Sequence, residues 1–181
     1  MTAAKKPKQS SKTPNVQRTS DDSEYLKLEN QVCFPLYAAA RMMVNAYRPL
    51  LGELGLTYPQ YLVLLVLWET DGLSVTAIGE QLHLDSGTLT PLLKRLATLG
   101  LIERRRNPDD DRIVGNWLTP MGMELKRRAM HVPVQLLCNA KLDIGELEPM
   151  RRVFRRLIDA LLPLQEPDST APARSVSSAG L

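Results

Sequence analysis

The chain has 181 residues, of which 44% are hydrophobic and 24% are charged, as in one globular domain with tails. Its net charge is only +3, and residues 1–20 hold five Lys or Arg and no Asp or Glu, so the remainder is slightly acidic. Global charge therefore gives no argument for nucleic-acid binding, which must rest on local basic clusters. The longest apolar run, YLVLLVLW, is too short to span a bilayer, and no apolar segment of a secretion signal follows the basic start. We expect a cytoplasmic protein with no membrane partner.

The residue types that carry catalysis or bind metals are sparse. The two cysteines, Cys33 and Cys138, lie far apart, and the two histidines, His83 and His131, have no metal-ligand spacing around them. There is no Ser/His/Asp set, no glycine-rich phosphate loop and no Thr-x-x-Cys pattern of a thiol peroxidase. We therefore expect no metal, no cofactor and no enzymatic activity.

A tail is predicted at each end of the chain, with one domain between the two tails. Residues 1–24 are polar and basic and residues 165–181 are polar, and neither stretch has apolar periodicity, which predicts disordered tails. Residues 25–164 are expected to form a single domain. From about residue 26 to 52, apolar residues recur at spacings of three and four, which predicts a helix with a broad apolar face. A second apolar stripe on this helix favours additional cover from a partner subunit.

Three helices come next, and the last two are closely spaced. A nearly all-apolar helix follows Thr57 and Pro59, a cap and first-turn pair. A helix over residues 75–82, a tight break at residues 83–85 and another helix from Ser86 follow. Helix, turn and helix in this arrangement predict a helix-turn-helix.

A hairpin and further helices complete the domain. Gly100 is placed to end the preceding helix as a left-handed residue. The β-type runs LIERRR and RIVGNWLT flank NPDDD and predict two strands joined by a loop. Thr119 and Pro120 begin a helix interrupted near Pro133, and a last helix covers about residues 143–162.

These elements predict a mainly α fold with a small β-hairpin wing. The winged helix-turn-helix covers about residues 56–119, and N- and C-terminal dimerisation helices cover about residues 26–52 and 120–164. In such folds the second helix of the motif enters the major groove of double-stranded DNA.

The second helix has the side chains that DNA contact needs. Ser86, Thr88 and Thr90 are short hydroxyl donors near its start that can approach base edges and phosphates, and unpaired backbone N–H groups there attract phosphate. Lys94 and Arg95 follow one to two turns later and can neutralise backbone charge. We predict that these five residues bind DNA.

The hairpin adds basic side chains, Arg104, Arg106 and Arg112. Arg112 near the tip can enter a narrow minor groove, and Asp110 beside it can orient the guanidinium. The alternative is that this charge run is an ordinary solvated face.

One winged helix covers about half an operator, so a homodimer on a palindromic operator is the expected assembly. The apolar faces of the first and last helices would supply the dimer surface. Alternatively, these faces pack on the core of their own chain.

The order of motifs over about residues 25–162 resembles the MarR family of dimeric winged-helix repressors, and the match includes LDSGTLTPLLKRL and the wing DDR…LT. The segments LENQVCFPLYAAARMMVNAYRPLL and GLTYPQYLVLLVLWE are similar to its organic-hydroperoxide-sensing branch, the OhrR-type repressors. Cys138 occupies the position of the second cysteine in the two-cysteine members of that branch.

This resemblance implies a redox switch. Cys33 would be the thiolate that organic hydroperoxides oxidise, Tyr47 and Tyr58 would hydrogen-bond its sulfur with Tyr37 nearby, and Cys138 would form an intersubunit disulfide that releases DNA. The alternative for Cys138 is a small apolar residue that only packs. A further alternative is a MarR-type repressor that responds to a small phenolic ligand and has structural cysteines.

The positions of Cys33, Pro35 and Tyr47 constrain this switch. Tyr47 lies fourteen residues after Cys33, about 21 Å along one helix, so contact between them requires two subunits. If the first helix begins at Cys33, Pro35 lies in its first turn and the positive helix end favours a thiolate. If the helix begins near Leu26, Pro35 lies inside it and costs a hydrogen bond or a kink.

Overall fold

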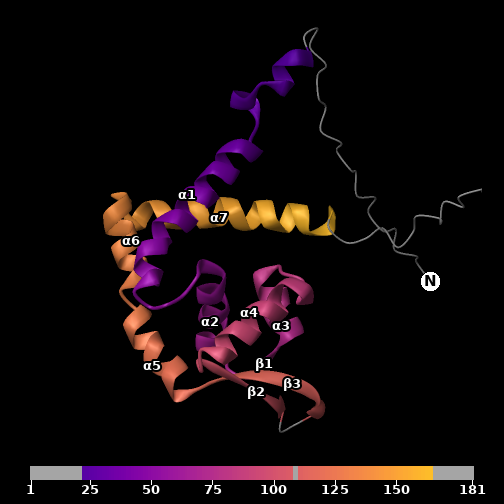
Figure 1. The fold of residues 1–181 in the computed structure, drawn as a ribbon. Coiled ribbons are helices and arrows are strands. Elements are labelled where there is room, and N and C mark those ends of the chain that lie inside the picture. Colours follow the sequence, from indigo (N-terminus) through magenta and orange to yellow (C-terminus); the bar gives the residue numbers. More distant parts are fainter. Residues whose placement is uncertain (1–21, 108–109, 165–181) are drawn as a thin grey trace, which may run out of the picture. The chain divides into compact units, whose positions relative to one another are not determined.

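The computed structural model describes residues 22–107 and 110–164, and these form helices and one small antiparallel sheet (Figure 1). The predicted fold class is confirmed. The chain divides into two compact units, Met1–Asn45 and Ala46–Leu181. Apart from residues 22–24, both predicted tails lie outside the described residues. Among the described residues, no helix is long and apolar enough to cross a bilayer.

The first long helix, α1, covers Cys33–Gly52, and two short 3₁₀ segments precede it, η1 (Asp22–Leu26) and η2 (Leu28–Asn30). The predicted start near residue 26 is therefore wrong. Pro35 gives the physical reason, because it has no N–H to bond the carbonyl one turn back and is tolerated best in a first turn. Of the two alternatives for this helix, the one that begins at Cys33 is observed.

The predicted helix-turn-helix forms in the second unit. Its elements are α2 (Tyr58–Glu69), the two-residue strand β1 (Leu73–Ser74), α3 (Val75–Leu82) and α4 (Ser86–Thr98). The N–H of Thr57 donates to Oε1 of Gln60 at 2.9 Å at the start of α2. His83 takes a left-handed conformation with φ 53° and ends α3. The boundaries of α3 and α4 agree with the prediction.

The wing consists of β2 (Ile102–Asn107) and β3 (Asp110–Leu118), and β1 pairs with the other edge of β3. All pairs are antiparallel, with Ile102 opposite Leu118 and Leu73 opposite Asn116. The sheet therefore has three strands, whereas the sequence predicted only the two of the hairpin. A strand of two residues has no detectable periodicity, so its pairing partner alone defines it.

Three helices follow the sheet, α5 (Pro120–Ala129), α6 (Val132–Ala140) and α7 (Ile144–Leu161), and a short 3₁₀ segment, η3 (Leu162–Leu164), comes after them. The side-chain oxygen of Thr119 accepts the N–H of Gly122 at 3.1 Å and caps α5, as predicted. Asp143 caps α7 in the same way.

The core of the second unit lies between α2, the inner face of α4, the sheet and α5. Its fully buried apolar side chains are Leu51, Val63, Leu64, Leu67, Ile78, Leu89, Leu93, Leu96, Ile102 and Val132. This packing fixes which side of α4 faces away from the protein. None of the residues of α7 is buried, by contrast.

Candidate functional site

The outer face of α4 gathers the polar residues predicted to bind DNA. Ser86, Thr90 and Lys94 recur every four residues and form one row, and Thr88 and Arg95, seven residues apart, form a second. Four of these side chains are exposed and Thr90 is partly buried. The leucines between them face the core, so the helix presents a polar outer face.

The start of α4 differs from the prediction in one respect. Asp85 is the cap: its Oδ1 accepts the N–H of Thr88 at 2.9 Å, and its Oδ2 accepts the Thr88 hydroxyl at 2.7 Å. Hydrogen bonds from the Thr88 side chain and then from its N–H lower the pKa of the Asp85 carboxyl. The expectation of unpaired N–H groups open to phosphate is therefore wrong at Thr88, because a carboxylate already occupies that position.

The arginines of the wing separate onto two faces. Arg104 and Arg106 are exposed and lie on the face of β2 that continues from buried Ile102. Arg105 points to the other face and pairs with Glu103. Asp110 and Arg112 belong to β3, but their side chains lie outside the described part of the chain.

Cys33 is the first residue of α1 and is a free, exposed cysteine. Tyr37 lies one helical turn later, with the guanidinium carbon of Arg41 5.5 Å from the centre of its ring. Cys138 is also free and exposed and lies on α6, in the second unit. Both thiols are thus accessible in the single chain.

Aromatic side chains cluster in the second unit where α1 ends and α2 begins. The ring centre of Tyr47 lies 5.0 Å from that of Tyr58 and 5.9 Å from that of Tyr61, and Tyr61 packs edge-on against Trp68 at 6.2 Å. Sequence reasoning named Tyr47 and Tyr58 but missed Tyr61. The spacing of three between Tyr58 and Tyr61, which puts both rings on one side of α2, was the available signal.

Burial keeps these phenols protonated. It raises the pKa of Tyr47 to about 12, with smaller contributions from Tyr58 and Tyr61. The pKa values of Tyr58 and Tyr61 are also raised, mainly by burial. Near neutral pH all three hydroxyls therefore retain the hydrogen that donation to an anion requires.

Hydrogen bonds tie this aromatic cluster to α5. Nε1 of Trp68 donates to the carbonyl of Gly122 at 3.0 Å, and Nζ of Lys126 donates to the carbonyl of Trp68 at 2.7 Å. Gly122 also lies so close to the wing that a Cβ there would be 2.1 Å from the carbonyl oxygen of Leu101. The end of α2, the start of α5 and the start of the wing therefore meet at one closely packed junction.

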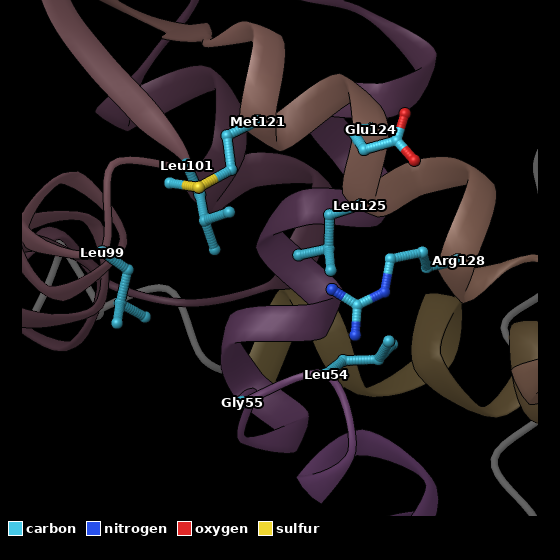
Figure 2. Close-up of a pocket in the computed structure, with 8 residues that line it drawn as sticks. All are labelled: Leu54, Gly55, Leu99, Leu101, Met121, Glu124, Leu125 and Arg128. Carbon is cyan, nitrogen blue, oxygen red and sulfur yellow. The ribbon is translucent and has the colours of Figure 1, made fainter.

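A half-open hollow of about 220 Å³ lies beside this junction (Figure 2). It is lined by Leu54, Gly55, Leu99, Leu101, Met121, Glu124, Leu125 and Arg128. In Figure 2 the carboxylate of Glu124 points away from the guanidinium of Arg128, which donates instead to the carbonyl of Glu53 at 3.2 Å. The lining of the hollow is mostly apolar and contains none of the DNA-binding or redox residues predicted from the sequence.

No group of three metal-ligating side chains occurs among the described residues. In the described part of the chain, the chemically notable groups are the two thiols, the phenols of the Tyr47, Tyr58 and Tyr61 cluster and the polar face of α4.

A helix-turn-helix followed by an antiparallel wing is the architecture of winged-helix transcription regulators. The model of the MarR family matches residues 56–114. The organic hydroperoxide resistance transcriptional regulator of Bacillus subtilis (strain 168) is 47% identical over 138 residues, which are 76% of this chain and 94% of that protein. The chain therefore belongs to the MarR family and is a transcription regulator, not an enzyme.

Solved structures agree with this assignment. Reduced AbfR bound to DNA has a TM-score of 0.64 and 35% identity, covering 80% of this chain and 99% of that one. A disulfide-formed AbfR has a TM-score of 0.53 and 35% identity, covering 80% and 97% of the two chains.

Proposed function

We propose that the protein is a homodimeric repressor that binds a palindromic operator while Cys33 is reduced and releases it when an organic hydroperoxide oxidises Cys33. The observation that carries the proposal is the position of Cys33, an exposed thiol at the first residue of α1, in a chain 47% identical to a hydroperoxide-resistance regulator. The cytoplasm, where operator DNA is found and thiols are kept reduced, is the matching compartment.

DNA binding is assigned to α4 and the wing. The polar outer face of α4 has the size and residue types that enter a major groove. Arg104 and Arg106 extend the positive charge along the wing, where they can neutralise phosphates. The related AbfR in its reduced form has been solved on DNA, which supports the same use of the fold here.

The second subunit is proposed from the uncovered face of α7. Exposed apolar side chains recur along this helix at spacings of three and four, at Met150, Val153, Phe154, Ile158 and Leu161. An amphipathic helix with no buried residue is stable when its apolar stripe is covered. A second copy, contributing the same stripe across a two-fold axis, meets this need.

The redox step uses Cys33 as nucleophile. Cys33 is the first residue of α1 and its thiol is exposed, so a hydroperoxide can reach the sulfur. The thiolate attacks the terminal oxygen of the hydroperoxide, the O–O bond breaks, and the alkoxide takes a proton and leaves as an alcohol, so that Cys33 becomes a sulfenic acid. The sulfur loses two electrons, and the peroxide is reduced.

The phenols have a supporting part. On α1, Tyr47 lies fourteen residues after Cys33, about 21 Å along the helix, so a Tyr47 hydroxyl that donates to this sulfur comes from the other subunit. Because its raised pKa keeps it protonated, Tyr47 is a donor throughout the physiological pH range. Tyr58 would act beside it, and Tyr37 would flank the thiol from its own helix.

Cys138 is proposed as the resolving residue. Its thiolate attacks the sulfenic sulfur of Cys33, hydroxide leaves and takes up a proton to form water, and an intersubunit disulfide forms. The exposure of Cys138 on α6 supports access to a partner. The disulfide would change the distance between the two α4 helices, which is how a dimer loses its operator.

The test uses reduced full-length protein and an operator selected from random duplex DNA, titrated with an alkyl hydroperoxide and analysed on non-reducing gels. We expect wild type to release DNA with formation of a covalent dimer, Cys33→Ser to stay bound, and Cys138→Ser to form no covalent dimer. Cys33→Ser that still releases DNA would exclude peroxide sensing at Cys33. Release by a phenolic ligand would then favour the ligand-responsive alternative, for which the hollow in Figure 2 is a candidate site.

A further inference from the structure

The hydroxyl of Thr88 has a defined hydrogen-bond polarity. It lies 2.7 Å from Oδ2 of Asp85, and an ionised carboxylate has lone pairs only, so the hydroxyl hydrogen must lie between the two oxygens. The Asp85 carboxylate also accepts the N–H of Thr88, which holds it in place. The outward side of the Thr88 oxygen therefore presents only lone pairs.

Thr90 has the same polarity for a different reason. Its hydroxyl lies 2.6 Å from the backbone carbonyl oxygen of Ser86, which is also an acceptor only, so Thr90 donates its hydrogen into its own helix. Two hydroxyls on the outer part of α4 are thus acceptors toward anything that approaches from outside.

This polarity restricts what they can bind on DNA. Phosphate oxygens present lone pairs only and are poor partners for an oxygen whose hydrogen is already used. In the major groove the available donors are the exocyclic amino groups, N6 of adenine and N4 of cytosine, whereas guanine and thymine present N7, O6 and O4 acceptors.

We propose that Thr88 and Thr90 are specificity-determining residues that accept hydrogen bonds from the exocyclic amino groups of adenine or cytosine, with Asp85 setting the polarity of Thr88. The inference rests on the proposed entry of α4 into the major groove. It goes beyond that entry, because it names the base chemistry that each threonine selects and makes both hydroxyls acceptors, where the sequence predicted donors to base edges and phosphates.

The first experiment identifies the bases. Operators are selected from random duplex DNA by reduced full-length wild type and by Thr88→Val, which keeps the side-chain shape but has no hydroxyl. We expect wild type to select adenine or cytosine at one position of the operator, and Thr88→Val to accept any base at that position. Where that base is adenine, replacing it with purine, which has no amino group, should weaken wild-type binding roughly three- to tenfold and leave Thr88→Val unchanged. Where the selected base is cytosine, it is replaced with 2-pyrimidinone, which lacks the amino group of cytosine, and the same result is expected.

The second experiment reverses the polarity. Asp85→Asn keeps a good helix cap, but its amide can donate to the Thr88 oxygen and free the hydroxyl hydrogen to point outward. We expect the selected base to change to guanine or thymine. The double variant Asp85→Asn/Thr88→Val controls for the removed negative charge: it should bind all sequences more tightly and show no base preference at that position. Thr90, whose partner is a backbone carbonyl, should keep its preference in every Asp85 variant.

The outcomes separate the two levels of proposal. Two results overturn the polarity inference and leave α4 as the helix that reads the DNA sequence. In the first, wild type binds selectively but prefers guanine or thymine at the Thr88 position. In the second, Asp85→Asn keeps the wild-type preference for adenine or cytosine. If the protein binds DNA without sequence selection, and substitutions on every face of the protein change its affinity equally, then the proposed DNA-reading role of α4 is overturned, and this inference with it.

Discussion

The ring of Tyr47, near the end of α1, lies 5.0 Å from the ring of Tyr58 at the start of α2, with the two planes tilted by 43°. This packing closes the turn between the two helices and puts the Tyr47 phenol in an environment that disfavours its anion. A local packing arrangement thereby sets the chemistry of a residue proposed to serve the redox site.

The alkaline stability of the protein should reflect this cluster. Because the folded-state pKa of Tyr47 is raised above its ordinary value of 10.0 to about 12, its contribution to stability is fully present below pH 10 and is lost as the pH rises through that interval. Urea unfolding at a series of alkaline pH values should show wild-type stability falling there, and Tyr47→Phe should fall less steeply. Equal slopes for the two proteins would contradict the assignment of the raised pKa to Tyr47.

The junction at Gly122 should not tolerate a side chain. A Cβ at this residue would lie 2.1 Å from the carbonyl oxygen of Leu101, so Gly122→Ala must move α5 away from the wing. We expect a loss of about 1–3 kcal/mol in the free energy of unfolding, measured by urea denaturation. Gly52→Ala is the matched control, because nothing lies within 4 Å of a Cβ there. A similar loss in both variants would mean that the close approach is not the cause.

The wing arginines should differ in their effect on the salt dependence of DNA binding. Arg104→Ala and Arg106→Ala should each reduce the slope of log K against log salt by roughly 0.9 for each phosphate that is no longer neutralised. Arg105→Ala should change it less, because Arg105 lies on the opposite face and pairs with Glu103. Fluorescence anisotropy at several salt concentrations gives the three slopes. Identical slopes for the three variants would show that the face of β2 on which an arginine lies does not decide whether it reaches DNA.

Asp71 should stabilise the base of the wing. Its Oδ1 accepts the N–H of Gly72 at 2.9 Å and the N–H of Leu118 at 2.8 Å. Asp71→Ala leaves the N–H of Leu118, in a partly buried position, without this acceptor, and we expect a cost of about 1–3 kcal/mol. Thermal unfolding gives the loss of stability, and amide exchange should quicken at Leu118. Glu69 is a neighbouring exposed acid, so Glu69→Ala is the control. It should change neither the thermal stability nor the exchange rate of the Leu118 amide.

Many helix boundaries of the second unit could be predicted because their signals are local. Thr119 before Pro120, and Gly100 with its φ of 69°, act within one turn of chain, where steric limits and caps decide the conformation. Apolar periodicity likewise assigned the buried face of α4. The resemblance of the chain, confirmed by the comparisons, identified the family. The roles of Cys33 and Cys138 remain predictions.

Tertiary structure decided what depends on distant residues. β1 is a strand only because Leu73 lies opposite Asn116, 43 positions away, whose Nδ2 also donates to the Leu73 carbonyl at 2.9 Å. Tyr61 joins the phenol cluster only because α1 and α2 pack together. Sequence alone determined most of the helices, the hairpin strands and the buried face of α4, because backbone preference and periodicity act over a few residues. The pairing of those elements, and with it the environment of each functional group, required the folded chain, because hydrogen bonds and burial are set by neighbours in space.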